Sequence, residues 1–322
     1  MLRTEDAMYL VCDGGGTKTE FLLFDKAGNV WARARSGGAN ANFTPPQQAA
    51  AEVCFGIEEC LQASGVPLSD VSDIVLFIPG FHTVLPQVKE HFGRDDIRQM
   101  GDVENAFYAA LGAPYGIAVL SGTGSFAVGQ TQNGQMVRAG GWGPLFGDEG
   151  SGYHIGVLCL SKLANLYDAD EHGTLLETVA LQELGLAGIA DLREAAYKPG
   201  FTRAKVARLC YVVERAARAG DKNACAILDE AADALSRLAE TVAKRLGNVS
   251  LPVALTGGVS NMGPLFTQRF ENAVHRRLPG CVCRRPQFSP VEGAALYMLC
   301  TQAGVDITDK TVLDNLKKKE KG

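Results

Sequence analysis

Two short glycine turns in the sequence have the composition of phosphate-binding loops. They are 13-DGGGTKT-19 and 121-SGTGS-125, and each follows an apolar stretch. Glycines allow backbone N–H groups to approach an anion that a Cβ atom would keep away, and the threonine hydroxyls add donors. The first turn lacks the spacing of a Walker P-loop and leads into a strand rather than a helix. The residues expected to contact phosphate are Asp13, Gly14, Gly15, Gly16, Thr17 and Lys18 in the first turn and Gly122, Thr123 and Gly124 in the second.

Asp13 places a carboxylate where phosphates are expected. Acidic and phosphate oxygens are compatible when Mg2+ and its waters lie between them, so Asp13 is a candidate magnesium contact through water. The alternative is that Asp13 only caps the turn.

A third glycine turn, 255-LTGGVSN-261, leaves a strand and opens a helix. The base, sugar or phosphate of a nucleotide could rest against Gly257 and Gly258. The alternative is an ordinary connection between a strand and a helix.

The stretch 141-GWGPLFGDEGSGYHI-155 surrounds an Asp-Glu pair with five glycines. The glycines leave Asp148 and Glu149 open to a ligand that is rich in hydroxyl groups. Trp142 could form an apolar wall against a sugar ring. Trp142 could equally belong to a core, and Glu149 could cap the following helix. Two further residues expected in the same pocket are Gly141 and Gly143.

An internal repeat organises the elements that carry these residues. In each half an apolar strand, at residues 8–12 or 116–120, precedes a glycine turn, a second strand, another turn and a third strand. In both copies the glycine of the later turn lies twelve residues after the glycine of the Gly-Thr pair. Each half therefore begins as a three-stranded antiparallel meander. Two unrelated hairpins are the alternative.

After each meander the apolar period changes to that of a helix. The resulting order of strands and crossover helices, given twice, predicts an α/β protein of two domains with like topology and a cleft between them. We place these domains at residues 1–115 with about 289–322, and at 116–288. The expected later strands are 73–79, 97–102, 252–258 and 282–285, and the expected helices are 45–64, a short one before residue 97, one from Val103, 150–166, 175–184, 205–219, 222–246, 262–277 and 290–302.

Composition excludes several classes of protein. The 322 residues are 46% apolar and 21% charged, with 31 basic and 36 acidic residues, so neither nucleic acid nor a membrane surface is an expected partner. No apolar run is long enough to span a membrane, and the first eleven residues lack the apolar core of a signal peptide. A cytoplasmic protein is expected, with residues 317–322 as a frayed end.

The nine cysteines are scattered, mostly through apolar stretches, and are expected to be buried reduced thiols. Cys281 and Cys283 are the close pair, and alternation along a strand would put both on one face. No CxxC motif and no His/Cys cluster accompanies them, so the sequence predicts no metal site there. The five histidines form no spaced cluster either, and a structural role is expected for His154.

Together these motifs resemble those of the BadF/BadG/BcrA/BcrD-type ATPase family, in the superfamily of sugar kinases, actin and Hsp70. The resemblance covers residues 8–302, and the most similar members are N-acetylglucosamine kinases. It implies two ribonuclease H-like (actin-like ATPase) domains, ATP and Mg2+ as cofactors, and a homodimer. The motifs that carry it are DGGGTKT, GDV after a strand, SGTGS, GGWGPLFGDEGSGY, LTGGVSN and PVEGAAL.

The resemblance also implies a catalytic base. In these kinases an aspartate at the end of the last strand of the first domain takes the proton of the sugar hydroxyl, and Asp102 in 99-QMGDVEN-105 matches it. A helix N-terminus would keep this carboxylate ionised. The alternative is that Asp102 is only an N-cap, and Glu104 is a weaker candidate because the helix turns it away.

For the substrate, the resemblance assigns Asp148 to the sugar hydroxyls. It matches a sugar-binding Gly-x-Asn loop to Asn40, with Asn42 as the alternative register. The implied reaction phosphorylates the 6-hydroxyl of an amino sugar, with N-acetylglucosamine preferred and glucosamine or N-acetylmuramic acid as alternatives. Some relatives are instead ATP-hydrolysing activators of dehydratases with a GGQD-like second turn. Because this chain has 121-SGTGS-125, the activator is the second hypothesis.

Overall fold

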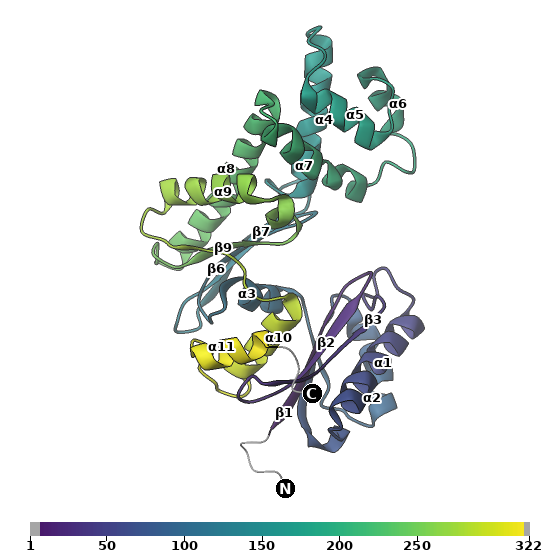
Figure 1. Cartoon of the computed structure of the whole chain (residues 1–322), viewed down its shortest axis with the longest axis vertical. Helices are drawn as coiled ribbons and strands as arrows, with labels where there is room; N and C mark the ends of the chain where they lie inside the picture. Colours follow the sequence, from purple (N-terminus) through teal and green to yellow (C-terminus); the bar gives the residue numbers. More distant parts are fainter. Residues whose placement is uncertain (1–6, 319–322) are drawn as a thin grey trace. The chain divides into compact units, whose positions relative to one another are not determined.

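The computed structural model of the chain, shown in Figure 1, describes residues 7–318. The described chain divides into two compact units. The N-terminal unit runs to Pro114 and takes in the chain again from Pro286 onward, and the C-terminal unit spans Tyr115–Arg285. Each unit is built around one five-stranded mixed sheet.

The sheet of the N-terminal unit has the strand order β3-β2-β1-β4-β5. A meander of three antiparallel strands is followed by two strands parallel to β1. The N-terminal half thus begins with the three-stranded antiparallel meander that the sequence predicts. The strands are β1 (Met8–Gly14), β2 (Thr19–Asp25), β3 (Val30–Ser36), β4 (Val71–Phe77) and β5 (Arg98–Met100).

Helices cover both faces of this sheet (Figure 1). On one face α1 (Pro46–Ser64) contacts β2 and β3, and Leu10, Phe21 and Ile57 share one apolar core. On the other face α10 (Pro290–Thr301) contacts β1, β2 and α3 (Val103–Leu111). The other helices of this unit are α2 (Leu85–Phe92) and α11 (Lys310–Lys317), with short 3-10 turns at Leu68–Asp70 and Phe81–Thr83.

The packing of α10 on α3 requires a glycine at the contact. A Cβ atom on Gly293 would lie 2.1 Å from the carbonyl oxygen of Asn105. Tyr297 then packs edge-on against Phe77 and Tyr108, with ring centroids 5.6 Å apart in both pairs. Asn105, which bears on the site below, is therefore held in a fully packed layer.

The sheet of the C-terminal unit repeats the same topology, in the order β10-β9-β6-β7-β8. Its first three strands form an antiparallel meander, and β9 and β10 are parallel to β6. The predicted repeat of two α/β units is thus confirmed. The strands are β6 (Gly116–Ser121), β7 (Ser125–Gln130), β8 (Met136–Gly140), β9 (Val253–Thr256) and β10 (Cys283–Arg284).

Between β8 and β9 this unit carries a group of helices where the N-terminal unit has α1. The long α8 contacts β6, β7, β8 and α9, while α4 and α7 pack on each other. Side-chain caps at Ser151, Thr174, Thr202 and Asp221 define four of the helix starts. The helices are α4 (Gly152–Asp168), α5 (Leu175–Leu184), α6 (Leu192–Ala195), α7 (Arg203–Arg218), α8 (Lys222–Arg245) and α9 (Pro264–Arg277), with 3-10 turns at Ile189–Asp191 and Gly258–Met262.

Helix α11 is not among the helices expected from the sequence. Val312 and Leu316 are buried on one face of this helix, and the Asn315 amide donates to the carbonyl oxygen of Ala27 at 3.0 Å. The expectation of a frayed end from residue 317 is wrong at Lys317, which ends this helix and bonds the side chain of Gln287. The rest of that end, from residue 319, and the first six residues lie outside the described part. Within residues 7–318 no helix combines the length and apolarity needed to cross a membrane.

Candidate nucleotide and substrate site

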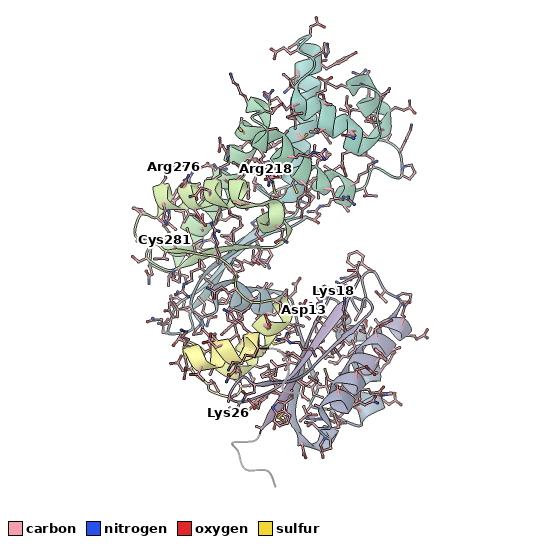
Figure 2. All side chains as sticks on the ribbon, viewed as in Figure 1. Asp13, Lys18, Lys26, Arg218, Arg276 and Cys281 are labelled. Atoms are coloured by element: carbon pink, nitrogen blue, oxygen red, sulfur yellow. The ribbon has the colours of Figure 1, made fainter. Side chains whose placement is uncertain are left out.

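The first glycine turn joins β1 to β2 as a tight hairpin. Gly14 pairs with Thr19, and the Gly15 N–H donates to the carbonyl oxygen of Lys18 at 2.9 Å. Asp13 ends the strand just before this turn, and Figure 2 shows Asp13 and Lys18 at the same end of the sheet. A Cβ atom on Gly14 would lie 2.7 Å from the side chain of Ile78, so packing requires this glycine.

The loop that holds Asn40 and Asn42 is bonded to this turn. The carbonyl oxygen of Gly15 accepts the N–H groups of Ala39 and Asn40, at 3.0 and 3.1 Å. Asn40 is buried and accepts the N–H of Asn42 on its own side-chain oxygen at 3.0 Å. The predicted phosphate turn and the predicted sugar loop are therefore neighbours, and the Asn40 oxygen already has a partner within the loop.

Asp13 and Asp102 lie at the same end of the sheet, because Asp13 pairs with Phe77 and Phe77 pairs with Met100, two residues before Asp102. Burial raises the pKa of Asp13 to about 6, and the nearby charges of Glu20 and Asp102 add to this effect. A hydrogen bond from the Asn105 amide to Asp13 Oδ1, at 2.6 Å, and the charge of Lys18 act in the opposite direction. Asn105 is not among the site residues expected from the sequence, because its contact with Asp13 spans 92 residues.

Asp102 is the N-cap residue of α3 by position, but its side chain makes no capping hydrogen bond. The carboxylate is exposed to solvent. A cap that leaves its oxygens free can accept a proton from a ligand, so the two roles considered for Asp102 are compatible here.

In the C-terminal unit two predicted nucleotide turns lie against each other. The Gly122 N–H donates to the Gly124 carbonyl at 2.9 Å, and the Gly122 carbonyl accepts the N–H of Gly152 at the start of α4, at 2.7 Å. An ideal Cβ on Gly258 would lie 4.0 Å from Gly122 Cα. A Cβ on Gly257, at φ +95°, would lie 2.5 Å from the Ser121 carbonyl oxygen. Thr123 sits between the two glycines of its turn.

Gly122 differs from these packed glycines. No described atom lies within 4 Å of the place where its Cβ would be, and its φ lies outside the left-handed region. Neither the fold nor the backbone therefore requires glycine at this position. A ligand that approaches the backbone closely is a physical reason for it.

Asp148 is buried and already paired. Arg203 donates to Asp148 Oδ2 at 2.8 Å and to the Thr123 carbonyl at 3.1 Å, while the Ser125 N–H donates to Oδ1 at 3.3 Å. Asp148 also has φ +65°, which is uncommon outside glycine. Asp148 thus ties its own loop to the second glycine turn. Sequence reasoning missed Arg203, which lies 55 residues away at the start of α7.

Glu149 does not cap α4, and that alternative is wrong. The cap is Ser151, whose hydroxyl accepts the N–H of His154 at 3.1 Å. Glu149 is exposed, while its carbonyl accepts the Ser125 hydroxyl at 2.8 Å. His154 takes the expected structural role, since its Nδ1 accepts the Gly150 N–H at 3.3 Å.

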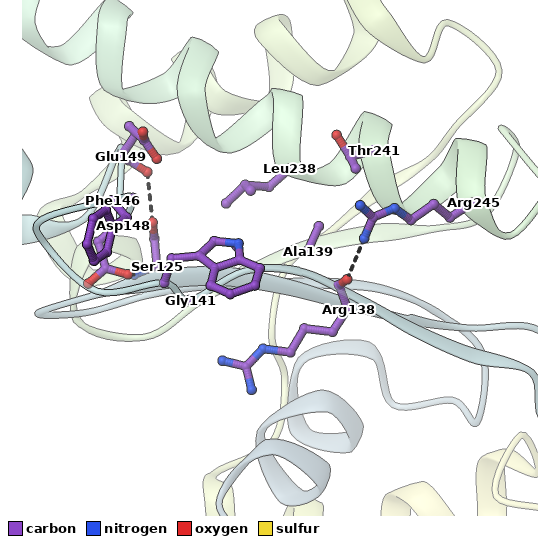
Figure 3. Close-up of a pocket in the computed structure, with 13 residues that line it drawn as sticks. Ser125, Arg138, Ala139, Gly141, Phe146, Asp148, Glu149, Leu238, Thr241 and Arg245 are labelled. Atoms are coloured by element: carbon purple, nitrogen blue, oxygen red, sulfur yellow. Dashed lines mark hydrogen bonds between the residues drawn. The ribbon is translucent and has the colours of Figure 1, made fainter.

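The loop 141–149 borders an open pocket of about 520 Å3 (Figure 3). Arg138, Ala139 and Gly141 lie on one side of it, and Leu238, Thr241 and Arg245 of α8 lie on the other. Further lining residues are Ser125, Gly140, Trp142, Phe146, Gly147, Asp148 and Glu149. Trp142 is 75% exposed, so the alternative that it belongs to a core is wrong. Gly143 lies in the same loop, outside the pocket lining.

A model of the BadF/BadG/BcrA/BcrD ATPase family matches residues 12–298 of the chain. The chain belongs to this ATPase family. Membership implies the use of ATP, and the glycine turns described above are suited to its phosphates. The predicted resemblance is therefore confirmed.

Two relatives that are named as kinases are similar to most of the chain. The N-acetylmuramic acid/N-acetylglucosamine kinase of Clostridium acetobutylicum is 32% identical over 278 residues, which is 83% of this chain and 90% of that protein. The N-acetyl-D-glucosamine kinase of Dictyostelium discoideum is 30% identical over 314 residues, which is 91% and 98% of the two chains.

Solved structures support the same fold. A candidate N-acetylglucosamine kinase from Chromobacterium violaceum has a TM-score of 0.68 at 27% identity, over 91% of this chain and 99% of that chain. A ROK family glucokinase from Streptomyces griseus, solved with glucose and AMPPNP, has a TM-score of 0.53 at 15% identity, over 93% and 100%. The chain has the two-domain actin-like ATPase fold that the sequence predicts, with a ribonuclease H-like sheet in each unit.

Proposed function

We propose that the protein is an ATP-dependent kinase that phosphorylates the 6-hydroxyl of an amino sugar, with N-acetylglucosamine as the preferred substrate. The observation that carries the proposal is Asp102, an exposed carboxylate without a capping bond, at the same end of the sheet as Asp13 and the glycine turn. The two relatives that are named as kinases of N-acetylated amino sugars support the substrate class.

In the proposed reaction the sugar hydroxyl attacks the γ-phosphorus of ATP. The new O–P bond forms as the bond from the γ-phosphorus to the bridging oxygen breaks, and ADP leaves with that electron pair. Asp102 takes the hydroxyl proton, which requires the carboxylate to be ionised before the attack. The turns at residues 14–18, 122–124 and 257–258 offer backbone N–H groups to the nucleotide, apart from those of Gly15 and Gly122, which donate within their own turns.

The oxygen donor of Asp13 suits Mg2+, which prefers carboxylate and water ligands. When bound, Mg2+ would balance the charge of the phosphates. Asp13 would hold it through a water molecule, and a nearby cation would favour the ionised form of a carboxylate whose pKa burial has raised to about 6. The Asn105 amide fixes the orientation of this carboxylate.

The loop 141–149 favours an acetamido group over a free amine. An acetamido group needs a small apolar wall and a hydrogen-bond partner, and Trp142, Leu145 and Phe146 are all exposed in this loop. A free amine would favour an additional carboxylate, which Glu149 could supply. Because these side chains are exposed, the loop would also leave room for the larger lactyl ether of N-acetylmuramic acid. This sugar is therefore the second candidate substrate.

A panel of sugars tests the proposal through ADP release. We expect kcat/KM for N-acetylglucosamine to exceed that for glucosamine by at least ~10-fold at one pH, about the value of one good contact. Proton-coupled phosphorus NMR of the product locates the phosphate, and coupling to the two C6 protons is expected. ADP release that does not depend on any sugar would instead favour the ATP-hydrolysing activator. A higher kcat/KM for glucosamine than for N-acetylglucosamine would overturn the proposed preference for an acetamido group but not the proposed kinase activity.

Two expectations about the protein in the cell are part of this proposal. We propose that the protein is cytoplasmic, as expected from its composition, and that it forms a homodimer. Light scattering of the purified full chain tests the dimer, since the chain alone has a mass of 34.2 kDa.

A further inference from the structure

Three side chains with metal-binding chemistry meet at one edge of the C-terminal unit. The side-chain donor atoms of His275, Cys281 and Cys283 all lie within 4.8 Å of one another. Cys281 is 6% exposed, Cys283 is half-buried and His275 is exposed. The prediction that no histidine accompanies the cysteine pair is wrong, because α9 brings His275 to it.

The backbone holds these three residues in place. His275 lies in the last turn of α9, and the Cys281 N–H donates to the carbonyl oxygen of Leu278 at 3.1 Å just after that helix. Cys283 lies in β10, in register with Val253 of β9, and the Val253 N–H donates to the Val282 carbonyl at 2.9 Å. Figure 2 shows Cys281 beside α9 in the loop that leads to β10. The donors are thus set by the fold itself.

Two thiols and an imidazole form a donor set for Zn2+ rather than for Mg2+, which prefers oxygen. At usual Zn–S and Zn–N lengths, tetrahedral donors are about 3.5–3.8 Å apart. Donors within 4.8 Å can reach that spacing when the side chains move by about 1 Å or less. Zn2+ binds cysteine as thiolate, so the ion displaces the thiol protons of Cys281 and Cys283 when it binds.

We propose that His275, Cys281 and Cys283 bind one Zn2+ ion, which fastens β10 to the end of α9. Glu271, one helical turn before His275, forms an ion pair with Arg285 at 3.6 Å, so a water molecule completes the four ligands. The ion has a structural role: β10 pairs with β9 through only two residues, and the chain passes to the other unit directly after it, at Pro286.

Metal binding to the full chain tests this site without any activity assay. The reduced protein is stripped with a chelator and titrated with Co2+, whose bonds to thiolate give a charge-transfer absorption, and Zn2+ is then added in competition. We expect about one metal ion per chain. Cys283→Ser and His275→Gln should each weaken binding by more than ~100-fold, because even an outer-sphere partner is worth about 10- to 100-fold.

The matched control is Cys225→Ser, which removes a partly buried thiol of the same unit from α8. It should bind metal as the unchanged chain does. Cys281→Ser is a third ligand variant, and if burial of Cys281 makes that variant unstable, the exposed His275 and half-buried Cys283 still decide the result. A reduced, stripped chain that binds neither Co2+ nor Zn2+ in the titration would overturn the proposal, as would equal losses of binding in Cys225→Ser and Cys283→Ser. Binding that vanishes only in the three ligand variants supports it.

Discussion

Replacing Asp13 with asparagine should stabilise the protein in the absence of nucleotide. The pKa of Asp13 is raised from 3.8 to about 6, chiefly by burial. That difference is about two pKa units, and each unit corresponds to about 1.4 kcal/mol. The ionised carboxylate therefore costs the folded state up to about 3 kcal/mol at neutral pH. Asp13→Asn removes the charge and should raise the free energy of unfolding by about 1–3 kcal/mol at pH 7.5.

The gain should depend on pH in a fixed direction. The folded state binds the Asp13 proton more tightly than the unfolded state does, so this group stabilises the fold at low pH. That contribution is lost as pH rises from about 4 through about 6, and no further change follows above it. The difference between Asp13→Asn and the unchanged chain should therefore be constant above about pH 7 and only about a third as large near pH 4.5.

Urea unfolding followed by tryptophan fluorescence can measure this difference in the free energy of unfolding for the N-terminal unit, which contains Asp13. The chain has two tryptophans, Trp31 in β3 of the N-terminal unit and Trp142 in the C-terminal unit. In a Trp142→Phe background the signal of Trp31 reports the unit that contains Asp13. In a separate measurement of nucleotide binding, Asp13→Asn should abolish the dependence on Mg2+. One change would then raise the free energy of unfolding and remove a function.

A control of opposite sign is available in the same unit. Hydrogen bonds from Arg94 hold the pKa of Asp96 below its usual value. At a pH above the ordinary pKa of a carboxyl group, Asp96→Asn should therefore lower the free energy of unfolding, and this effect should disappear as the pH falls. Our reasoning about Asp13 is refuted if Asp13→Asn is less stable than the unchanged chain at pH 7.5, or if its gain is the same at pH 4.5.

Three further substitutions test the proposed site. Asp102→Asn should lower turnover by ~10²- to 10⁴-fold with little change in ATP and sugar affinity, and near-normal turnover would remove this residue from the mechanism. Gly122→Val should abolish ATP binding measured by calorimetry while circular dichroism stays unchanged, whereas Gly188→Val, also unhindered in its own loop, should bind ATP normally. Arg203→Met leaves a buried Asp148 without its cation, so KM for the sugar should rise at least ~10-fold and the melting temperature should fall; an unchanged KM would show that Asp148 needs no such support.

The repeat and the element types could be predicted because their signals are local. Alternating apolar residues, a glycine turn and a second turn at the same spacing define each meander, and β1 to β3 and β6 to β8 follow that pattern. The start of α3 at Val103 and both ends of α5 (Leu175–Leu184) agree with the sequence because turn residues or caps lie there. The strand 252–258 proved shorter, since the glycines after Thr256 belong to a turn.

Contacts between distant parts of the chain could not be predicted from local patterns. Nothing near Asp13 in the sequence indicates Asn105, and nothing near Asp148 indicates Arg203. His275 precedes Cys281 with a spacing that matches no common zinc motif, so its place beside the pair depends on where α9 ends. In each case a side chain acquires its chemical environment only when the fold brings two segments together.

The duplicated fold has given its two equivalent turns different charges. The turn after β1 follows a carboxylate, Asp13, whereas the matching turn after β6, 121-SGTGS-125, carries no charged side chain. A polyphosphate meets the Asp13 carboxylate at the first turn, where Lys18 offsets part of that charge. By contrast, Arg203 bonds the second turn, and its own charge is paired with Asp148. We therefore expect chelation of divalent cations to weaken nucleotide contacts at residues 14–18 much more than those at residues 122–124. Nucleotide bound without a cation should then protect only the amide hydrogens of the C-terminal unit against hydrogen exchange.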